Sequence, residues 1–272
     1  MGREIQRLPR AEPVFGVTSL DNRLYLLRRN KSSKQVEVYD IDSYLLQRYL
    51  TVPGLGIACD IVACAHNRCA YISDSSHNSV HKIALLGDTI TQWPVNDEPR
   101  RLSVSLTHGV LVTCRWARKI KELSTDGQLI REVVLPGDVV SLWHSVQLSS
   151  GEFIVCHGNV CDPVHRVCLV SSDGHVVKSF GGPQGSSSHE MNTPIRLAVD
   201  ENEFVFVADL NNRRVLLLSP SLTFVRQGVS REQLTGWPVA VHLDVNRQRL
   251  YVGDGENEDD KWIAGQVVLF SL

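Results

Sequence analysis

Phe206-Val207-Ala208-Asp209 is the clearest copy of a short pattern in which an apolar strand ends at a polar residue. The pattern occurs six times. The other five copies are Tyr25-Leu26-Leu27-Arg28, Tyr71-Ile72-Ser73-Asp74, Val112-Thr113-Cys114-Arg115, Ile154-Val155-Cys156-His157 and Tyr251-Val252-Gly253-Asp254. Their last residues lie about 45 positions apart, a period typical of one blade of a β-propeller. A chain of 272 residues therefore accommodates six units.

The residues around each copy indicate four short strands. In the fifth unit these are Ile195–Val199, Glu203–Ala208, Arg214–Leu218 and Thr223–Gln227, separated by clusters of turn-forming residues. No segment shows a sustained helical period.

The last unit needs a strand from elsewhere in the chain. Gln266–Phe270 reads as a third strand with no fourth behind it, and Gly2–Leu8 can complete that blade. We therefore predict an all-β, six-bladed propeller of four-stranded antiparallel blades that spans residues 1–272, with residues 1–10 as the closing strand of the last blade. The expected blades are residues 12–53, 55–95, 98–137, 140–181, 194–228 and 237–272.

Composition excludes several classes of protein. The apolar fraction is 43 % and the charged fraction 21 %, as in an ordinary globular chain. A net charge of −2 argues against a globally basic nucleic-acid-binding coat. Apolar runs are about five or six residues long, far short of the roughly 20 that cross a bilayer. Because no apolar leader follows Met1, we expect a cytoplasmic protein without a membrane contact.

The seven cysteines are expected to be buried and reduced. They form no C-x2-C pair of the kind that holds zinc. The one exception we consider is Cys156 with Cys161, which could face each other across a short hairpin.

Blade five carries a family resemblance. Phe180–Gly185, Asn192–Asp200 and Phe206–Val215 are similar to the NHL repeat, whose pattern is a glycine-rich turn, then P-x-x-[IL]-A-V-D, then V-A-D-x-x-N-x-R-[VI]. Blades two and six match it in part, and the other three match only in strand pattern. The chain thus resembles NHL-like propellers of invertebrate animals and of tripartite-motif ubiquitin ligases. The resemblance implies a module that recognises RNA or protein, as a domain of something larger.

The third unit carries a cluster of basic residues. Within residues 98–122, arginines and lysines exceed acids by four charges, and two basic stretches flank one strand-turn-strand unit. In a propeller, the loop entering each first strand and the loop between the second and third strands lie on one face. We predict binding residues on this face at Arg100, Arg101, Arg115, Trp116, Arg118 and Lys119. The alternative for each is a solvated turn that contributes little to folding or binding.

Further candidates lie across the predicted channel mouth. They are Asp60, His144, Arg196, Arg213, Trp237 and Trp262. All five tryptophans, including Trp93 and Trp143, are expected on or near this face, where aromatic and arginine side chains favour interfaces. For Trp93, Trp143 and Trp237 the competing interpretation is packing between blades.

Acidic residues recur at the ends of the predicted second strands, at Asp74, Asp209 and Asp254. Such a carboxylate can accept hydrogen bonds from nearby backbone amides, so we assign it to structure. The acidic loop of the sixth unit lacks the spacing of a calcium loop. No metal or other cofactor is expected.

An enzyme needs ligands at the channel mouth. The residues predicted to begin the first strands are Phe15, Cys59, Arg100, His144, Ile195 and Val239. Peptidyl-amidoglycolate lyases are similar propellers that place three zinc-binding histidines at such positions, and only His144 matches. One imidazole cannot supply three zinc ligands, so we expect His144 to be a hydrogen-bonded channel residue.

The sequence is compatible with three functions. The leading prediction is a non-catalytic module that binds a protein or peptide partner. The second is single-stranded RNA binding by the same face, which a steep salt dependence would reveal. The third is a hydrolase or lyase that works around Asp60, Arg101, His144 and Arg196. The sequence leaves the oligomeric state open.

Overall fold

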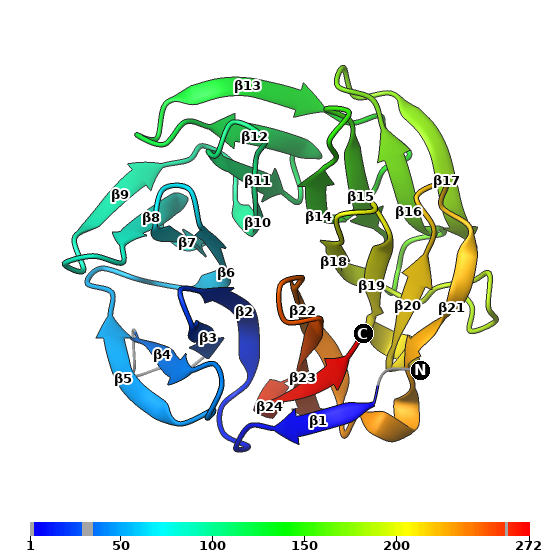
Figure 1. Ribbon diagram of the computed structural model, residues 1–272. Helices are drawn as coiled ribbons and strands as arrows, with labels where there is room; N and C mark the ends of the chain where they lie inside the picture. The colour runs from blue at the N-terminus through cyan, green and yellow to red at the C-terminus, as the bar shows by residue number, and fades with distance from the viewer. Residues whose placement is uncertain (1–2, 29–34, 259–260) are drawn as a thin grey trace.

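Six four-stranded antiparallel sheets surround a central channel as the blades of a propeller (Figure 1). The computed structural model describes residues 3–28, 35–258 and 261–272. The predicted fold class is confirmed. Neither of the two short helices in these residues is long or apolar enough to cross a membrane.

Each blade begins at the channel and ends at the rim. Blade one comprises β2 (Val14–Leu20), β3 (Arg23–Arg28), β4 (Gln35–Asp40) and β5 (Leu46–Thr51). Blade two comprises β6 (Ala58–Cys64), β7 (Cys69–Asp74), β8 (Ser79–Ala84) and β9 (Ile90–Pro94). Blade three comprises β10 (Pro99–Val104), β11 (Val110–Cys114), β12 (Lys119–Leu123) and β13 (Leu129–Val134).

The second half of the ring repeats this order. Blade four comprises β14 (Leu142–Gln147), β15 (Phe153–His157), β16 (His165–Val170) and β17 (Val176–Gly182). Blade five comprises β18 (Pro194–Val199), β19 (Val205–Asp209), β20 (Arg214–Leu218) and β21 (Phe224–Val229). Blade six comprises β22 (Trp237–Asp244), β23 (Arg249–Glu258), β24 (Lys261–Ser271) and β1 (Glu4–Arg7). Two 3-10 helices, η1 (Leu210–Asn212) and η2 (Arg231–Gln233), lie in connections.

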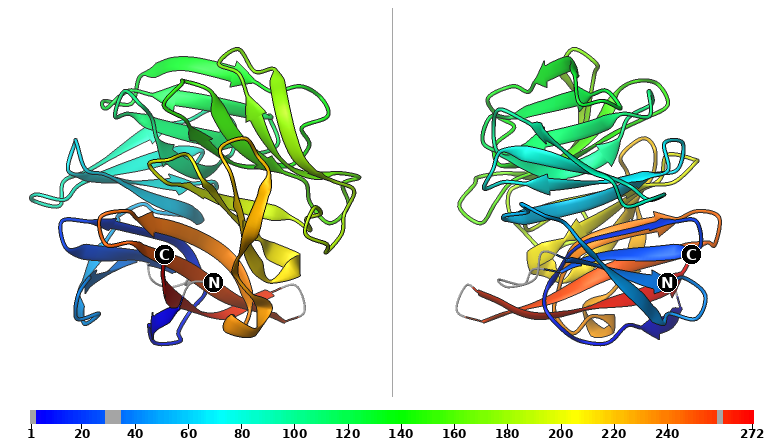
Figure 2. Two further views of the ribbon diagram at one scale, coloured as in Figure 1. Left: turned by 45° about the vertical axis from the view of Figure 1, so that its right-hand side comes forward. Right: turned by 90° about the vertical axis from the view of Figure 1, so that its left-hand side faces the viewer.

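Blade six is completed by the N-terminal strand, as predicted. Glu4 pairs with Phe270 and Arg7 with Val268, and the Leu8 amide donates to the Val267 carbonyl at 2.9 Å. The hairpin of β23 and β24 extends beyond the neighbouring blades (Figure 2). Closure removes the unpaired edge that β24 would otherwise expose.

The core consists of six apolar clusters, and each joins two neighbouring blades. The cluster between blades one and two, for example, packs Tyr25 and Leu27 against Ile61 and Ile72. Because the sheets pack face to face, both faces of a middle strand are buried, as in β7 and β11. Stability is therefore spread around the ring.

Two cysteine and tryptophan predictions need correction or refinement. Cys156 is buried opposite Val167, whereas Cys161 is exposed in the next loop, so the two do not face each other. All seven cysteines are free and six are buried, as expected. Trp93 lies in β9 and packs against Tyr71, so it belongs to the core between blades two and three and not to the mouth.

Candidate binding site at the mouth of the central channel

A β-bulge occurs at the same place in every first strand, and it builds the channel mouth. In β6, Ala58 pairs with Asp74 and Asp60 pairs with Ser73, which leaves Cys59 without a partner in the ladder. The other five first strands shift register at the equivalent position. A bulge re-aims side chains, so two successive residues of each strand approach the channel.

We call the bulged residues the mouth ring and the residues that follow them the inner ring. The mouth ring is Phe15, Cys59, Arg100, Trp143, Ile195 and Val239. The inner ring is Gly16, Asp60, Arg101, His144, Arg196 and Ala240, all buried. The prediction that placed His144 with the mouth ring is wrong by one residue: Leu142 pairs with His157 and His144 with Cys156, so Trp143 is the bulged residue.

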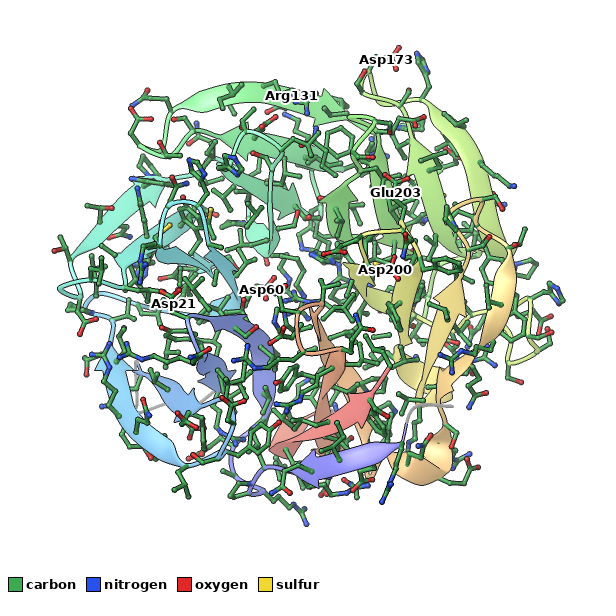
Figure 3. The ribbon with its side chains drawn as sticks, viewed as in Figure 1. Asp21, Asp60, Arg131, Asp173, Asp200 and Glu203 are labelled. Atoms are coloured by element: carbon green, nitrogen blue, oxygen red, sulfur yellow. The ribbon has the colours of Figure 1, made fainter. Side chains whose placement is uncertain are left out.

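An ion pair spans the inner ring. The two oxygens of Asp60 accept the two terminal nitrogens of Arg196, from the blade on the opposite side of the channel. Asp60 lies near the middle of the ring (Figure 3) and is 0 % exposed. Its carboxylate also accepts the amides of Leu102 and Ile61, each at 2.8 Å. This set of donors satisfies a buried charge that would otherwise be costly.

His144 is held as a neutral imidazole. The Leu197 amide donates to Nδ1 at 3.1 Å, so the proton lies on Nε2, which is 3.1 Å from the Leu102 carbonyl oxygen and donates to it. Burial, followed by the nearby Arg196 charge, lowers the pKa of His144 well below its usual range. The ring therefore joins blades three, four and five as a hydrogen-bonded channel residue.

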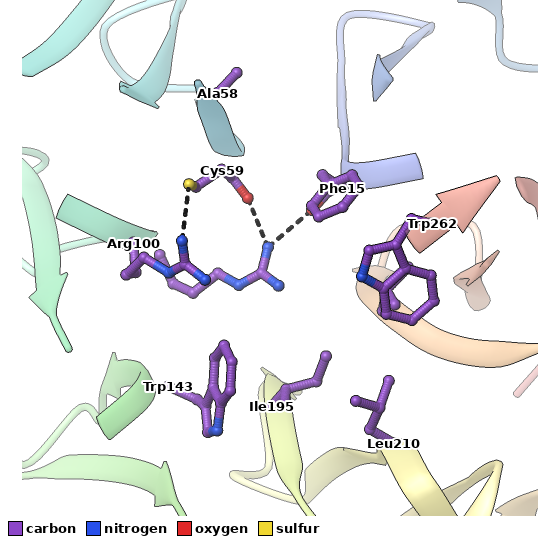
Figure 4. Close-up of a pocket in the computed structure, with 10 residues that line it drawn as sticks. Phe15, Ala58, Cys59, Arg100, Trp143, Ile195, Leu210 and Trp262 are labelled. Atoms are coloured by element: carbon purple, nitrogen blue, oxygen red, sulfur yellow. Dashed lines mark hydrogen bonds between the residues drawn. The ribbon is translucent and has the colours of Figure 1, made fainter. Parts of the chain in front are cut away.

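Arg101 carries a buried charge at the floor of the mouth. Its Nη1 donates to the carbonyl oxygens of Phe15 at 2.9 Å and Cys59 at 2.6 Å (Figure 4). Burial, followed by the charge of Arg196, lowers the pKa of Arg101 to about 10. No carboxylate among the described residues forms an ion pair with Arg101.

The mouth ring, Arg101 and Trp262 enclose a small pocket above the inner ring. Its volume is about 110 Å³, and its lining includes the whole mouth ring, Arg101, Ala58, Leu210 and Trp262. Figure 4 shows Phe15, Trp143 and Trp262 around its opening. Arg100 reaches the Sγ of Cys59 at 3.6 Å and pairs with Glu98 at 3.5 Å. Asp60 and His144 lie outside this pocket.

The opposite end of the channel opens into a second cavity of about 320 Å³, lined by His144, Arg196 and His242 among others. Within the described part of the chain, no residue lines both cavities. The inner ring contributes to both cavities: Arg101 lines the first, and His144 and Arg196 line the second.

The predicted surface role of Arg115 needs correction. Its guanidinium lies 3.6 Å from the centre of the Trp143 ring and 4.3 Å from that of Trp116, and the residue is buried. Burial lowers the pKa of Arg115 to about 10. Trp116 covers it and is 63 % exposed, so Trp116 itself lies at the surface.

The remaining basic residues of blade three lie apart from the pocket. Arg118 is exposed in the turn before β12, at a left-handed φ of 53°. Lys119 pairs with Glu132 at 2.8 Å, and the neighbouring Lys121 pairs with Asp97 at 2.8 Å. The charge excess read from the sequence is therefore partly offset, because folding brings in Glu132 from the adjacent strand β13 and Asp97 from the loop before β10.

A row of aromatic rings connects the pocket to blade five. Trp262 contacts Phe15 edge-on at 6.3 Å between centroids and Trp237 at 6.4 Å, and the Arg213 guanidinium lies 3.9 Å from the Trp237 ring centre. Trp262 belongs to β24. A polar hollow of about 490 Å³, lined by Arg213, Arg231 and Trp237 among others, lies beside this row.

The recurring acids brace the loops, as predicted. Asp74 accepts the Gly56 amide at 2.6 Å, Asp209 the Asn192 amide at 2.7 Å, and Asp254 the Gly236 amide at 2.7 Å. Burial opposes ionisation of Asp74, but hydrogen bonds from the Gly56 amide and from the side chains of His77 and Ser76 outweigh it and lower the pKa of Asp74 to about 2. Each acid thus ties a second strand to the loop that enters the first.

Metal ligands do not gather in the described residues: no three histidine, cysteine, aspartate or glutamate side chains there are placed to hold an ion. Asp259 and Asp260 of the acidic loop lie outside these residues.

The comparisons establish the fold alone. No protein-family model matches this chain, and no curated protein matches it. Virginiamycin B lyase from Staphylococcus aureus is similar, with 10 % identity over 97 % of this chain and 98 % of that chain and a TM-score of 0.66. The PQQ-bound aldose sugar dehydrogenase from Streptomyces coelicolor has 12 % identity over 99 % of this chain and 98 % of that chain, with a TM-score of 0.72. A Bacteroides caccae protein of unknown function has 14 % identity over 88 % of this chain and 85 % of that chain, with a TM-score of 0.65.

Proposed function

We propose that this chain is a non-catalytic binding module that recognises a protein or peptide partner at the mouth of its channel. The observation that carries this proposal is the pocket above Arg101, which combines aromatic walls with arginines. Aromatic and arginine side chains dominate the energetic centres of protein interfaces. A volume of about 110 Å³ is below the roughly 150 Å³ cavity that admits benzene, so the pocket suits one side chain or chain end.

The surroundings of the pocket support an extended partner. The row of Phe15, Trp262 and Trp237 leads away from it toward Arg213, and such a row offers contact area with little loss of side-chain entropy. One partner residue would occupy the pocket while its neighbours lie along the row.

An NHL-type assignment belongs to this proposal. In blade five, Asp209 accepts hydrogen bonds from Asn212 and from Arg214, each at 2.8 Å. Arg214 also donates to the carbonyl oxygens of Ser186, Ser187 and Glu190. These contacts give a physical reason for the spacing D-x-x-N-x-R and support the NHL-type assignment. With that assignment we propose a substrate-recognition propeller of a larger, cytoplasmic protein.

Single-stranded RNA is the second candidate, favoured by the polar hollow beside Trp237. Arg213, Arg231 and the exposed face of Trp237 could meet phosphates and a base. Binding of an oligouridylate would then weaken by orders of magnitude between about 50 and 200 mM salt. Peptide binding anchored by aromatic rings would change little.

A peptide selection tests the leading proposal. A displayed library of random peptides is selected on the folded chain, and enriched peptides are measured against the Trp262→Ala and Arg100→Ala variants. We expect both to weaken binding about tenfold or more. Tyr49→Ala, an exposed aromatic on the outer strand β5, is the matched control and should leave binding unchanged.

The proposal fails if no peptide is enriched, or if the selected peptides bind all three variants as well as the wild type. Metal analysis addresses the lyase or hydrolase alternative that the fold neighbours raise. Stoichiometric zinc or calcium in the purified protein would favour that alternative over a binding module.

A further inference from the structure

Arg101 is the unusual group of the mouth pocket, because its charge has no carboxylate partner there. Asp60, the nearest acid, gives its oxygens to Arg196 and to two backbone amides. In the described residues, Arg101 has only the carbonyl acceptors of Phe15 and Cys59, and both contact Nη1. The residue is 6 % exposed, so water does not compensate the charge as it would at the surface.

Part of the guanidinium remains available for a ligand. An arginine carries five N–H donors in a planar fork, and those on Nη2 and Nε of Arg101 have no acceptor in the described residues. This side of the fork matches the two oxygens of a carboxylate. Arg101 itself is one of the residues that line the pocket.

The charge balance favours an anion with one negative charge. Arg196 is matched by Asp60, and Arg100 is matched by Glu98. His144 is neutral, because its Nδ1 accepts the Leu197 amide. Among the residues that line the pocket and their ion-pair partners, one positive charge, that of Arg101, is left over. A dianionic phosphate would overcompensate it.

The side chains that line the pocket determine which chemical group can carry the anion. Phe15, Ile195 and Val239 are apolar, and Trp143 and Trp262 add aromatic faces. Such walls accept an alkyl stem, and the volume of about 110 Å³ leaves no room for a nucleoside.

We infer that the mouth pocket binds a carboxylate of the partner, paired with the free side of the Arg101 guanidinium while its stem packs among the aromatic walls. This inference deepens the proposed function and rests on it. The carboxylate comes either from the C-terminus of a peptide or from an aspartate or glutamate side chain.

Pairs of small probes test the chemistry in the wild-type protein. N-acetyl-leucine and its amide represent a chain end, whereas N-acetyl-glutamate α-amide and N-acetyl-glutamine amide represent a side chain. Binding is followed by tryptophan fluorescence and by the Nε–H resonances of the arginines. We expect at least one acid to bind about tenfold or more tightly than its amide, because the amide cannot form the charge-assisted bidentate contact with Arg101.

The preferred acid identifies the source of the carboxylate. If only N-acetyl-leucine discriminates, the partner presents its C-terminus; if only the glutamate probe does, it presents an acidic side chain. Equal binding of acids and amides, or tighter binding of methyl phosphate than of both acids, would overturn the inference.

Variants locate the contact. Arg101→Gln should abolish the preference for the acid, and Arg101→Lys, which keeps the charge but not the fork, should retain part of it. Arg118→Gln, an exposed arginine of the same blade outside the pocket, is the matched control and should change nothing. A preference that survives Arg101→Gln contradicts the assignment. Thermal melts confirm that each variant is folded. The comparison of acids with amides is made on the wild-type protein and does not depend on the variants.

The two proposals can fail separately. Selected peptides that depend on Trp262 but bind equally well when amidated and without acids would sustain peptide recognition and refute the carboxylate. Acid probes that bind through Arg101 while no peptide is enriched would sustain the carboxylate site and refute peptide recognition.

Discussion

Asp60 of blade two and Arg196 of blade five form a two-pronged ion pair straight across the central channel. They are 136 positions apart in the sequence, and both are buried. The pair therefore links opposite sides of the ring, whereas the apolar clusters link only neighbours.

We expect Asp60→Asn or Arg196→Gln to lower the free energy of unfolding by about 3 to 5 kcal/mol, because each leaves an uncompensated charge in the channel. The double variant should lose less than the sum of the two. Urea denaturation measures this cycle. Arg68→Gln, which breaks an exposed pair with Asp21, is the control and should cost within about 1 kcal/mol. Equal losses for Asp60→Asn and Arg68→Gln would contradict a structural role of the channel pair.

Stability should fall on mild acidification. Burial lowers the pKa of His157 to about 4 and that of His144 well below its usual range. The unfolded chain, whose histidines titrate near 6.5, then binds more protons than the folded one. The stabilisation is complete above about pH 6.5 and is lost toward pH 4, at up to about 1.4 kcal/mol per pH unit for each histidine.

Urea denaturation at several pH values checks this dependence. His157→Gln should reduce the slope between pH 6.5 and 4.5, and His175→Gln, whose ring is exposed, should not. An unchanged slope for His157→Gln would show that another group is responsible.

The closing strand should be needed for a stable ring. Leu8 is buried against Leu269, so Leu8→Ala should cost about 2 to 5 kcal/mol, whereas Ile5→Ala on the exposed face of β1 should cost little. Deletion of residues 1–8 should lower the melting temperature by several degrees or cause aggregation. An unchanged melting temperature of the deletion variant would mean that the stability of the ring does not depend on the closing strand.

Arg115 and Arg118 should differ in their effect on stability. Arg115→Ala removes a guanidinium stacked between two tryptophans and should cost about 1 to 2 kcal/mol. Arg118→Ala, in an exposed turn, should stay within about 0.5 kcal/mol. Thermal and urea denaturation compare the two. The same cost for both would place Arg115 at the surface, as the sequence alone suggested.

The propeller could be predicted because its evidence is local and repeated. Apolar strands recur at a steady period, and the unpaired strand at Gln266–Phe270 pointed to its partner. The strands of blade five begin and end within two residues of their predicted positions.

The sequence predicted where the candidate site lies but not which residues contact one another there. In three first strands a proline precedes the bulged residue, at Pro99, Pro194 and Pro238, but the bulge of blade four has no such mark, and a shift of one residue exchanged His144 for Trp143 at the mouth. The partner of Asp60 comes from the opposite blade, and no periodicity selects Arg196 among the arginines. Lys119 has no acidic partner within residues 98–122, because its partner Glu132 lies on the next strand.

The pairing of β1 with β24 also has a consequence in time. Arg3 and Ser271, which are hydrogen bonded, lie 268 positions apart, so during synthesis β1 waits on the order of tens of seconds for its partner. The first five blades are each encoded in one continuous stretch and can form in order as they leave the ribosome. Blade six cannot. The exposed and largely charged or polar surface of β1 suits a segment that must stay unpaired in water until then, and the ring closes only after β24 has been made.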